Sequence, residues 1–118
     1  MQDAGRRILI LDDEADRLQP LQTLLQAREW NVTLLSDSEI AFALLESAPA
    51  DIVLVDYHMA GSSGMHFVEK ARLAYPGCRF IMMSGAPDES VQEFCHASGI
   101  QLITKPFRST DLLRILGQ

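Results

Sequence analysis

Short apolar runs in this sequence repeatedly end on a polar residue that could do chemistry. These residues are Asp12, Asp13, Asp56, Ser84 and Lys105. In an open parallel sheet, ligands bind beyond the carboxyl ends of the strands. If the runs are strands of one such sheet, with the first and third as neighbours, we expect the polar residues to meet at a single edge.

The first three of these residues would form a cluster of carboxylates. Two carboxylates about 4 Å apart near a protein surface repel each other by roughly 1–4 kcal/mol. A hard divalent cation removes this repulsion, and Mg²⁺ suits a site built from a few carboxylates, waters and a phosphate oxygen. Asp12, Asp13 and Asp56 therefore predict a Mg²⁺ site.

Ser84 and Lys105 add the groups that a phosphate needs. A serine hydroxyl can donate a hydrogen bond to one phosphoryl oxygen, and a lysine ammonium can neutralise another as a point charge. Phosphoryl transfer to a carboxylate depends mainly on positioning and charge stabilisation, which this set of residues supplies. Each residue alone has a structural explanation, such as a helix cap or a turn. Their combination at successive strand ends is what indicates function.

The hydrophobic pattern that must position these residues alternates between continuous apolar runs and segments with helical spacing. The runs predict five strands, at residues 7–11, 32–35, 51–56, 79–83 and 100–104. A helical segment follows each run, and this alternation predicts right-handed βαβ units. The expected fold class is α/β, with three layers: a doubly wound, five-stranded parallel sheet covered by helices on both faces.

Several residues mark where the helices should begin. Pro20 predicts that the first helix either kinks there or begins close enough for the proline to lie in its first turn. Ser36, with Glu39 three residues later, has the spacing of a capping box for the second helix. For the last helix, Ser109 or Thr110 is the expected cap.

Length and composition favour one globular domain over residues 1–118. The net charge of −6 weighs against nucleic-acid binding, which rests on clustered Lys and Arg. No apolar run approaches the ~18 residues of a membrane span, and the N-terminus lacks the pattern of a signal peptide. Cys78 and Cys95 are too few for a disulfide framework, which favours a cytoplasmic location.

The order and spacing of the polar residues resemble the receiver domain of bacterial two-component response regulators and hybrid histidine kinases. The match covers essentially the whole chain, from the pair Asp12-Asp13 through Asp56 and Ser84 to Lys105-Pro106. The expected architecture is flavodoxin-like, with strand order 2-1-3-4-5. The last helix is short, which is compatible with a piece cut from a longer regulator or hybrid histidine kinase.

The resemblance implies a role for each residue of the site. Asp56 is the phosphoacceptor, and Asp13 and Asp56 bind Mg²⁺ directly. Asp12 acts through a metal-bound water, and the backbone carbonyl of His58 supplies the third protein ligand. Lys105-Pro106 matches a position where the family has a cis peptide bond, which would aim the lysine side chain into the site.

The resemblance also implies partners. A histidine kinase or a histidine phosphotransfer protein would donate the phosphoryl group, and a downstream effector domain or protein would receive the signal. No nucleic acid or membrane is expected to bind this domain. It would not be an enzyme in the ordinary sense, because it would catalyse only its own phosphorylation and dephosphorylation.

Two residues depart from the family pattern and keep alternatives open. Ala60 stands where the family often has proline, and Leu102 stands where a Tyr or Phe usually acts as a rotameric switch. Leu102 favours a pseudo-receiver, a docking module that is never phosphorylated, but the intact acidic site argues against it. A phosphatase of the haloacid-dehalogenase type is a more distant alternative, because that family carries an Asp-x-Asp nucleophile motif on its first strand.

Overall fold

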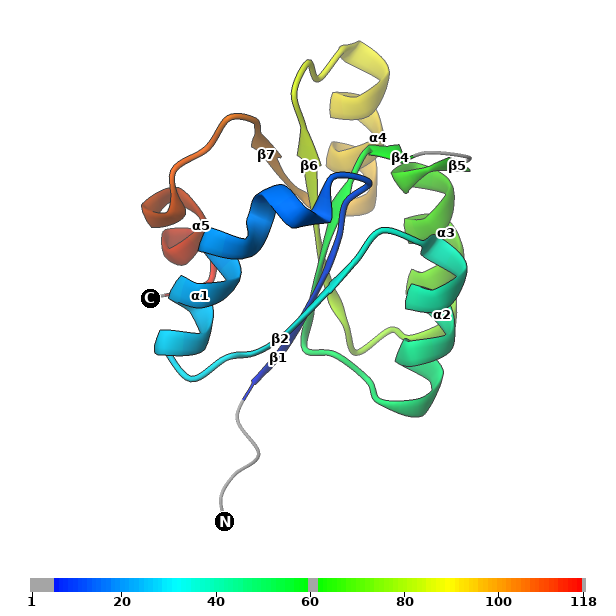
Figure 1. Ribbon diagram of the computed structural model, residues 1–118. Coiled ribbons are helices and arrows are strands. Elements are labelled where there is room, and N and C mark those ends of the chain that lie inside the picture. Colours follow the sequence, from blue (N-terminus) through cyan, green and yellow to red (C-terminus); the bar gives the residue numbers. More distant parts are fainter. Residues whose placement is uncertain (1–5, 60–61, 118) are drawn as a thin grey trace.

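The computed structural model describes residues 6–59 and 62–117, and its centre is one parallel sheet of five strands in the order β2-β1-β3-β6-β7 (Figure 1). The strands are β1 (Arg7–Leu11), β2 (Asn31–Leu35), β3 (Ile52–Asp56), β6 (Arg79–Ser84) and β7 (Gln101–Thr104). Counted along the chain, these five strands have the order 2-1-3-4-5, which confirms the predicted topology. β1 and β3 are therefore neighbours, with Leu11 in register with Val55.

Five α-helices and one short 3₁₀ helix complete the three layers. They are η1 (Ala15–Leu18), α1 (Gln19–Ala27), α2 (Ser38–Ser47), α3 (Gly64–Ala74), α4 (Glu89–Ser98) and α5 (Ser109–Ile115). Helices α1 and α5 cover one face of the sheet, and α2, α3 and α4 cover the other (Figure 1).

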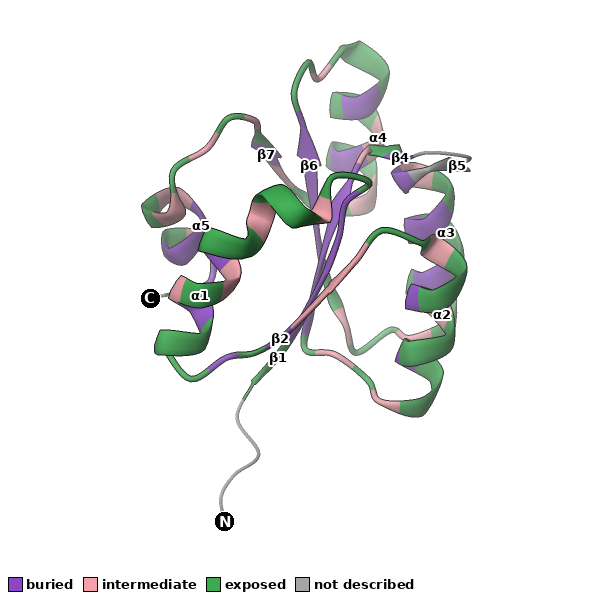
Figure 2. Cartoon of the chain, viewed as in Figure 1, coloured by how far each residue is buried: buried purple, intermediate pink, exposed green. Residues whose placement is uncertain are grey.

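The central strands are buried on both faces, as continuous apolar runs predict. Successive side chains of a strand point to opposite faces, so Ile8 and Ile10 of β1 pack with α1 and α5. Leu9 and Leu11 pack with the helices on the other side. Every residue of β3 is buried, and Figure 2 shows the central strands β1, β3 and β6 as the buried centre of the molecule.

The first helix begins where the proline allows it. Pro20 lies in the first turn of α1, where a missing backbone N–H costs no intrahelical hydrogen bond, so the second of the two expectations is confirmed. The predicted cap at Ser36 is wrong. Asp37 is the N-cap residue of α2, and its carboxylate accepts hydrogen bonds from the backbone N–H groups of Glu39 and Ile40 at 2.8 and 3.1 Å.

The predicted cap of the last helix is also wrong, because Ser109 and Thr110 both lie inside α5. Arg108 is the N-cap residue, and its backbone N–H donates to the carboxylate of Asp111 at 3.0 Å. The carboxylate of Asp111, in the first turn, thus satisfies the N–H of the N-cap residue, which is one half of a capping box.

The segment that follows β3 contains a small element that the sequence did not predict. Two short strands, β4 (His58–Met59) and β5 (Ser62–Ser63), pair antiparallel, and Gly64 then begins α3. Ala60 and Gly61 lie outside the described residues. No helix among the described residues is long and apolar enough to cross a membrane.

Candidate phosphoacceptor site

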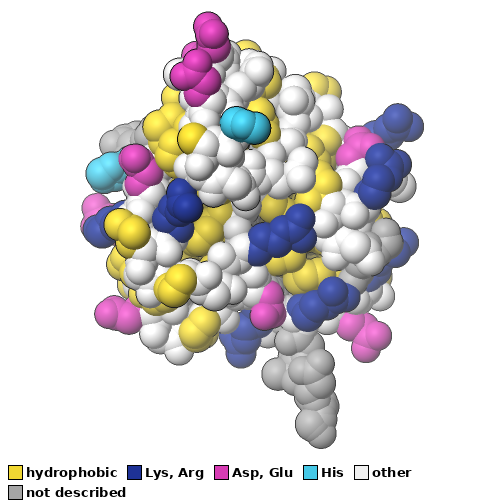
Figure 3. Space-filling view, turned by 180° about the vertical axis from the view of Figure 1, so that it is seen from behind, with side chains coloured by type: hydrophobic (Ala, Val, Ile, Leu, Met, Phe, Trp, Pro, Cys, Tyr) yellow, Lys and Arg dark blue, Asp and Glu magenta, His cyan; other side chains and the backbone are white. Residues whose placement is uncertain are grey.

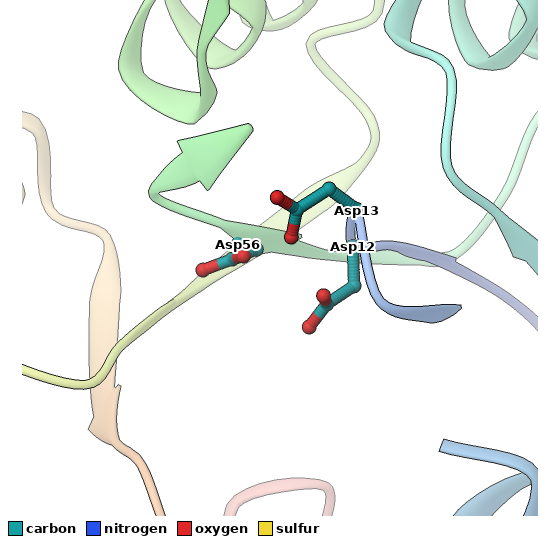
Figure 4. Close-up of side chains that lie close together, drawn as sticks. All are labelled: Asp12, Asp13 and Asp56. Carbon is teal, nitrogen blue, oxygen red and sulfur yellow. The ribbon is translucent and has the colours of Figure 1, made fainter. Parts of the chain in front are cut away.

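Three carboxylates meet at the carboxyl-terminal edge of the sheet, as the sequence predicted. Asp12 and Asp13 follow β1, and Asp56 is the last residue of β3 (Figure 4). Each offers one oxygen atom, and these oxygens all lie within 4.8 Å of one another. Asp12 and Asp56 are buried, whereas Asp13 is exposed to solvent. An all-oxygen cluster of this size fits a hard divalent cation such as Mg²⁺, and Asp13 leaves it open on one side.

Both carboxylate oxygens of Asp12 already have protein partners. One accepts a hydrogen bond from the backbone N–H of Glu14 at 2.8 Å. The other accepts a hydrogen bond from the Lys105 ammonium at 2.7 Å, and this ion pair spans the site from β1 to the end of β7. A buried charge requires such a partner, so Lys105 holds Asp12 in place as well as facing the site.

Asp56 lies in a less favourable environment for a charge. One of its oxygens is 3.6 Å from the Lys105 ammonium and accepts a hydrogen bond from the backbone N–H of His58 at 3.3 Å. Burial raises the pKa of the Asp56 carboxyl, and the charges of Asp12 and Asp13 raise it further. Lys105 and the His58 N–H oppose this rise, but the pKa stays above its ordinary value. The apo site therefore has uncompensated negative charge, which a cation would offset.

Lys105 balances these acids from the opposite side of the site. Burial would lower the pKa of its ammonium group, but the hydrogen bond and the charge of Asp12, together with the charge of Asp56, outweigh burial and raise it. Its backbone N–H donates to the carbonyl of Ser84 at 2.8 Å, which ties the lysine to the end of β6. The Lys105-Pro106 peptide bond is cis, as predicted.

Ser84 ends β6 next to Thr104 of β7 and is fully buried. Its hydroxyl oxygen accepts a hydrogen bond from the backbone N–H of Ala86 at 3.3 Å. That bond leaves the hydroxyl hydrogen available as a donor. The structure thus places all of the predicted side chains at one edge of the sheet, although the backbone carbonyl of His58 stays a prediction as a metal ligand.

Gly64 is a positioning residue that sequence reasoning missed. Its backbone N–H donates to the carbonyl of Tyr57 at 2.8 Å, directly after the acceptor strand. A Cβ atom on Gly64 would overlap the carbonyl oxygen of Asp56 and lie 2.9 Å from its carbonyl carbon. Only glycine therefore lets α3 begin this close to Asp56.

A hollow of about 550 Å³ opens beside the carboxylates. Its charged lining residues are Asp12, Glu14, Arg17 and Lys105. Most of its wall is apolar and comes from η1, α1 and the segment before α5, through Leu18, Leu21 and Phe107. The combination of charged residues and an apolar wall suits a protein surface that presents a reactive group to the site.

The fold and the site together define a doubly wound α/β domain with an acidic pocket at the carboxyl edge of its sheet. Within that class, the chain belongs to the response regulator receiver domain family, whose model matches residues 8–117. The family assignment confirms the predicted resemblance to receiver domains.

Curated relatives match the chain over nearly its full length. It is 31% identical over 120 aligned positions to the hydrogenase transcriptional regulatory protein HoxA of Cupriavidus necator, covering 100% of this chain and 25% of that protein. It is 30% identical to the sensory transduction protein RegX3 of Mycobacterium tuberculosis, covering 90% of this chain and 47% of that protein. The chain therefore spans less than half the length of these two relatives.

Solved structures agree with the fold. A CheY-like receiver domain protein from Methanospirillum hungatei superposes with a TM-score of 0.89 at 26% identity, covering 96% of this chain and 91% of that one. The signal receiver domain of an HD domain-containing protein from Pseudomonas fluorescens superposes with a TM-score of 0.88 at 28% identity, covering 97% and 93%. Both likenesses extend over the whole sheet and its helices.

Proposed function

We propose that this domain accepts a phosphoryl group on Asp56 in a Mg²⁺-dependent reaction and signals through protein–protein contacts. The observation that carries the proposal is the convergence of three carboxylate oxygens within 4.8 Å of one another beside the Lys105 ammonium. Membership of the receiver family supports it, because these residues stand in the family's order along the chain.

Asp56 is the nucleophile in this proposal. One of its carboxylate oxygens attacks the phosphorus of a phosphohistidine or of a small acyl phosphate, and an O–P bond forms. The bond from phosphorus to the leaving group breaks, and the leaving nitrogen or oxygen keeps the electron pair. The transferred group carries charge on its equatorial oxygens, so its position and the charges around it decide the rate.

Asp13 and Asp56 would hold the Mg²⁺ ion directly, with Asp12 acting through a water and the His58 carbonyl completing the protein ligands. Bound there, the ion offsets the negative charge of the carboxylates and of the incoming phosphoryl group. The burial of Asp12 and its two hydrogen bonds suit an outer role, because both of its oxygens already have partners.

Lys105 and Ser84 would receive the phosphoryl oxygens. The Lys105 ammonium lies 3.6 Å from the Asp56 carboxylate, close enough to neutralise a group attached to it. The buried Ser84 hydroxyl can turn its hydrogen toward another phosphoryl oxygen.

The phosphodonor would be a histidine kinase or a histidine phosphotransfer protein. The hollow beside Lys105 suits such a donor, because its apolar wall can pack against a helix of the donor while the donor's imidazole reaches Asp12 and Lys105. A downstream effector would read the phosphorylated state, and the reaction would take place in the cytoplasm. The domain would turn over no substrate other than its own aspartyl phosphate.

Labelling with acetyl phosphate tests this proposal. In the presence of Mg²⁺, the chain should take up one phosphoryl group, and excess EDTA should abolish the labelling. Equal labelling in EDTA would overturn the metal dependence. Steady release of phosphate from a generic ester such as p-nitrophenyl phosphate would favour the phosphatase alternative instead.

A further inference from the structure

A second hollow, of about 380 Å³, lies at the end of the sheet opposite the carboxylates. It forms where α3 and α4 end and where β6 and β7 begin. Its volume falls in the range of about 300–1,000 Å³ that is typical of ligand pockets and is larger than a single ion requires. Nothing in the phosphoryl chemistry of Asp56 uses this hollow.

Two arginines dominate the polar side of the hollow. Arg72 lies in the last turn of α3, and Arg79 is the first residue of β6. Both are exposed, and neither forms an ion pair with a carboxylate among residues 6–59 and 62–117. A guanidinium presents several N–H donors in a planar fork that matches a carboxylate. The hollow therefore offers two forks for an anionic ligand.

Backbone N–H groups around the hollow already donate to protein carbonyl groups and are therefore not available to an anionic ligand. The N–H of Gly99 donates to the carbonyl of His96, and the N–H of Ile100 donates to the carbonyl of Cys95. The N–H of Arg79 donates to the carbonyl of Asp51. Recognition of an anion would therefore fall to the arginine side chains.

The whole amino-terminal end of the sheet is basic in an otherwise acidic protein. In a βαβ unit the helices run opposite to the strands, so helix ends and strand beginnings share this end of the molecule. The arginines placed there by the topology are Arg6, Arg7, Arg28, Arg72, Arg79 and Arg114. Fewer acids share that end, namely Glu29, Glu46 and Asp51. This contrasts with the net charge of −6 of the whole chain.

An apolar wall accompanies the two arginines. Pro76, Phe80 and Ile100 line the hollow, and Pro76 and Ile100 keep part of their surface exposed. Figure 3 views the molecule from behind and shows Lys and Arg side chains beside exposed hydrophobic surface in the middle of that view. A ligand that satisfied both features would carry carboxylates and an apolar side chain.

We propose that this hollow binds an acidic peptide segment of a partner protein. Its carboxylates would pair with Arg72 and Arg79, and an apolar side chain between them would pack against Pro76 and Ile100. The hollow lies at the opposite end of the sheet from Asp56, so a partner bound there would leave the phosphoacceptor edge accessible.

Fluorescence anisotropy with a defined probe tests the proposal on the intact chain. The probe is a fluorescein-labelled peptide of the sequence Glu-Glu-Leu-Glu-Glu-Leu, measured at low ionic strength, where exposed charges are least screened. Each of Arg72→Gln and Arg79→Gln should weaken binding by up to about 5-fold, the upper range for an exposed ion pair. The double variant should lose up to about 25-fold, because losses multiply when each arginine pairs with a different carboxylate of the peptide. Arg114→Gln removes the same charge from an exposed position on α5 and should bind like wild type.

Thermal unfolding of every variant separates binding from a structural role. Both arginines lie near the carboxyl ends of helices, where a positive charge also stabilises the protein by interacting with the helix dipole. Loss of peptide binding at an unchanged unfolding temperature supports the proposal. Equal losses in Arg114→Gln and in each single arginine variant would show an unspecific charge effect and overturn it. Displacement of the peptide by inorganic phosphate at matched ionic strength would also overturn it, because the hollow would then be a small-anion site.

Discussion

Replacing Gly64 by alanine should distort the phosphoacceptor without touching any charged group of the site. The added Cβ would overlap the backbone carbonyl oxygen of Asp56 and lie 3.0 Å from the Cα of Tyr57. All the atoms in its way belong to the backbone, so no side-chain rotation relieves the overlap. Either the start of α3 or the end of β3 must move, and the second movement displaces Asp56.

The cost can be worked from this geometry. Overpacking a well-filled region typically destabilises a protein by about 1–3 kcal/mol. Alanine regains up to about 0.5–1 kcal/mol over glycine inside a helix, and less at its first residue. We expect a net loss of about 1–2.5 kcal/mol. For a domain of this size, each kcal/mol lowers the unfolding temperature by about 4 °C. The expected shift is therefore a fall of roughly 4–10 °C.

Gly77→Ala is the matched control for this experiment. A Cβ on Gly77 would meet nothing within 4 Å, so this substitution should leave stability almost unchanged. Thermal unfolding followed by circular dichroism measures the loss of stability. The rate of labelling by acetyl phosphate, at a temperature where both variants are folded, measures the distortion of the phosphoacceptor. If Gly64→Ala melted within about 2 °C of wild type and labelled at the same rate, the steric argument would be wrong.

Three further predictions concern the site and its output. Asp13→Asn should weaken Mg²⁺ binding more than Asp12→Asn does, because both oxygens of Asp12 already have protein partners. Isothermal titration measures both affinities, and equal losses of Mg²⁺ affinity in the two variants would show that the site is arranged differently. Asp56→Asn should raise the unfolding temperature of the metal-free protein at neutral pH. The pKa of Asp56 is raised in the folded protein, so the carboxyl group's contribution to stability is present below its ordinary pKa of 3.8 and is lost as pH rises through the folded-state pKa. The stability advantage of Asp56→Asn over wild type should therefore shrink in acid. A variant less stable than wild type at neutral pH would contradict this prediction. Because Leu102 has no ring to move, phosphorylation should change amide chemical shifts most around Ser84 and less along α4. Partner affinity should change by ~1 kcal/mol. Chemical-shift changes that spread mainly along α4 would refute this prediction.

The sequence predicted the sheet well because buried parallel strands leave a strong local signal. All five runs became strands, with ends that differ from the prediction by one residue at most. Polar residues at the ends of those runs then had to meet once β1 and β3 became neighbours. The carboxylate cluster was predictable for this reason, although no local sequence pattern alone indicates it.

Features that depend on a single contact were not predictable in the same way. The pairing of Lys105 with Asp12 joins residues that are 93 positions apart, and the lysine was assigned only to a phosphoryl group. The role of Gly64 depends on how closely α3 approaches the backbone of β3, which no spacing reveals. The predicted helix caps were wrong because Asp37 rather than Ser36 caps α2, and because α5 begins one residue earlier than expected, after Arg108.

Intact-protein mass spectrometry after treatment with acetyl phosphate and Mg²⁺ tests the central claim most directly. Wild type should gain the mass of one phosphoryl group, and Asp56→Asn should gain none. Asp51→Asn is the matched control, because it makes the same chemical change at an exposed position just before β3. It should be labelled like wild type. Equal labelling of wild type and Asp56→Asn would contradict the assignment of Asp56 as the phosphoacceptor.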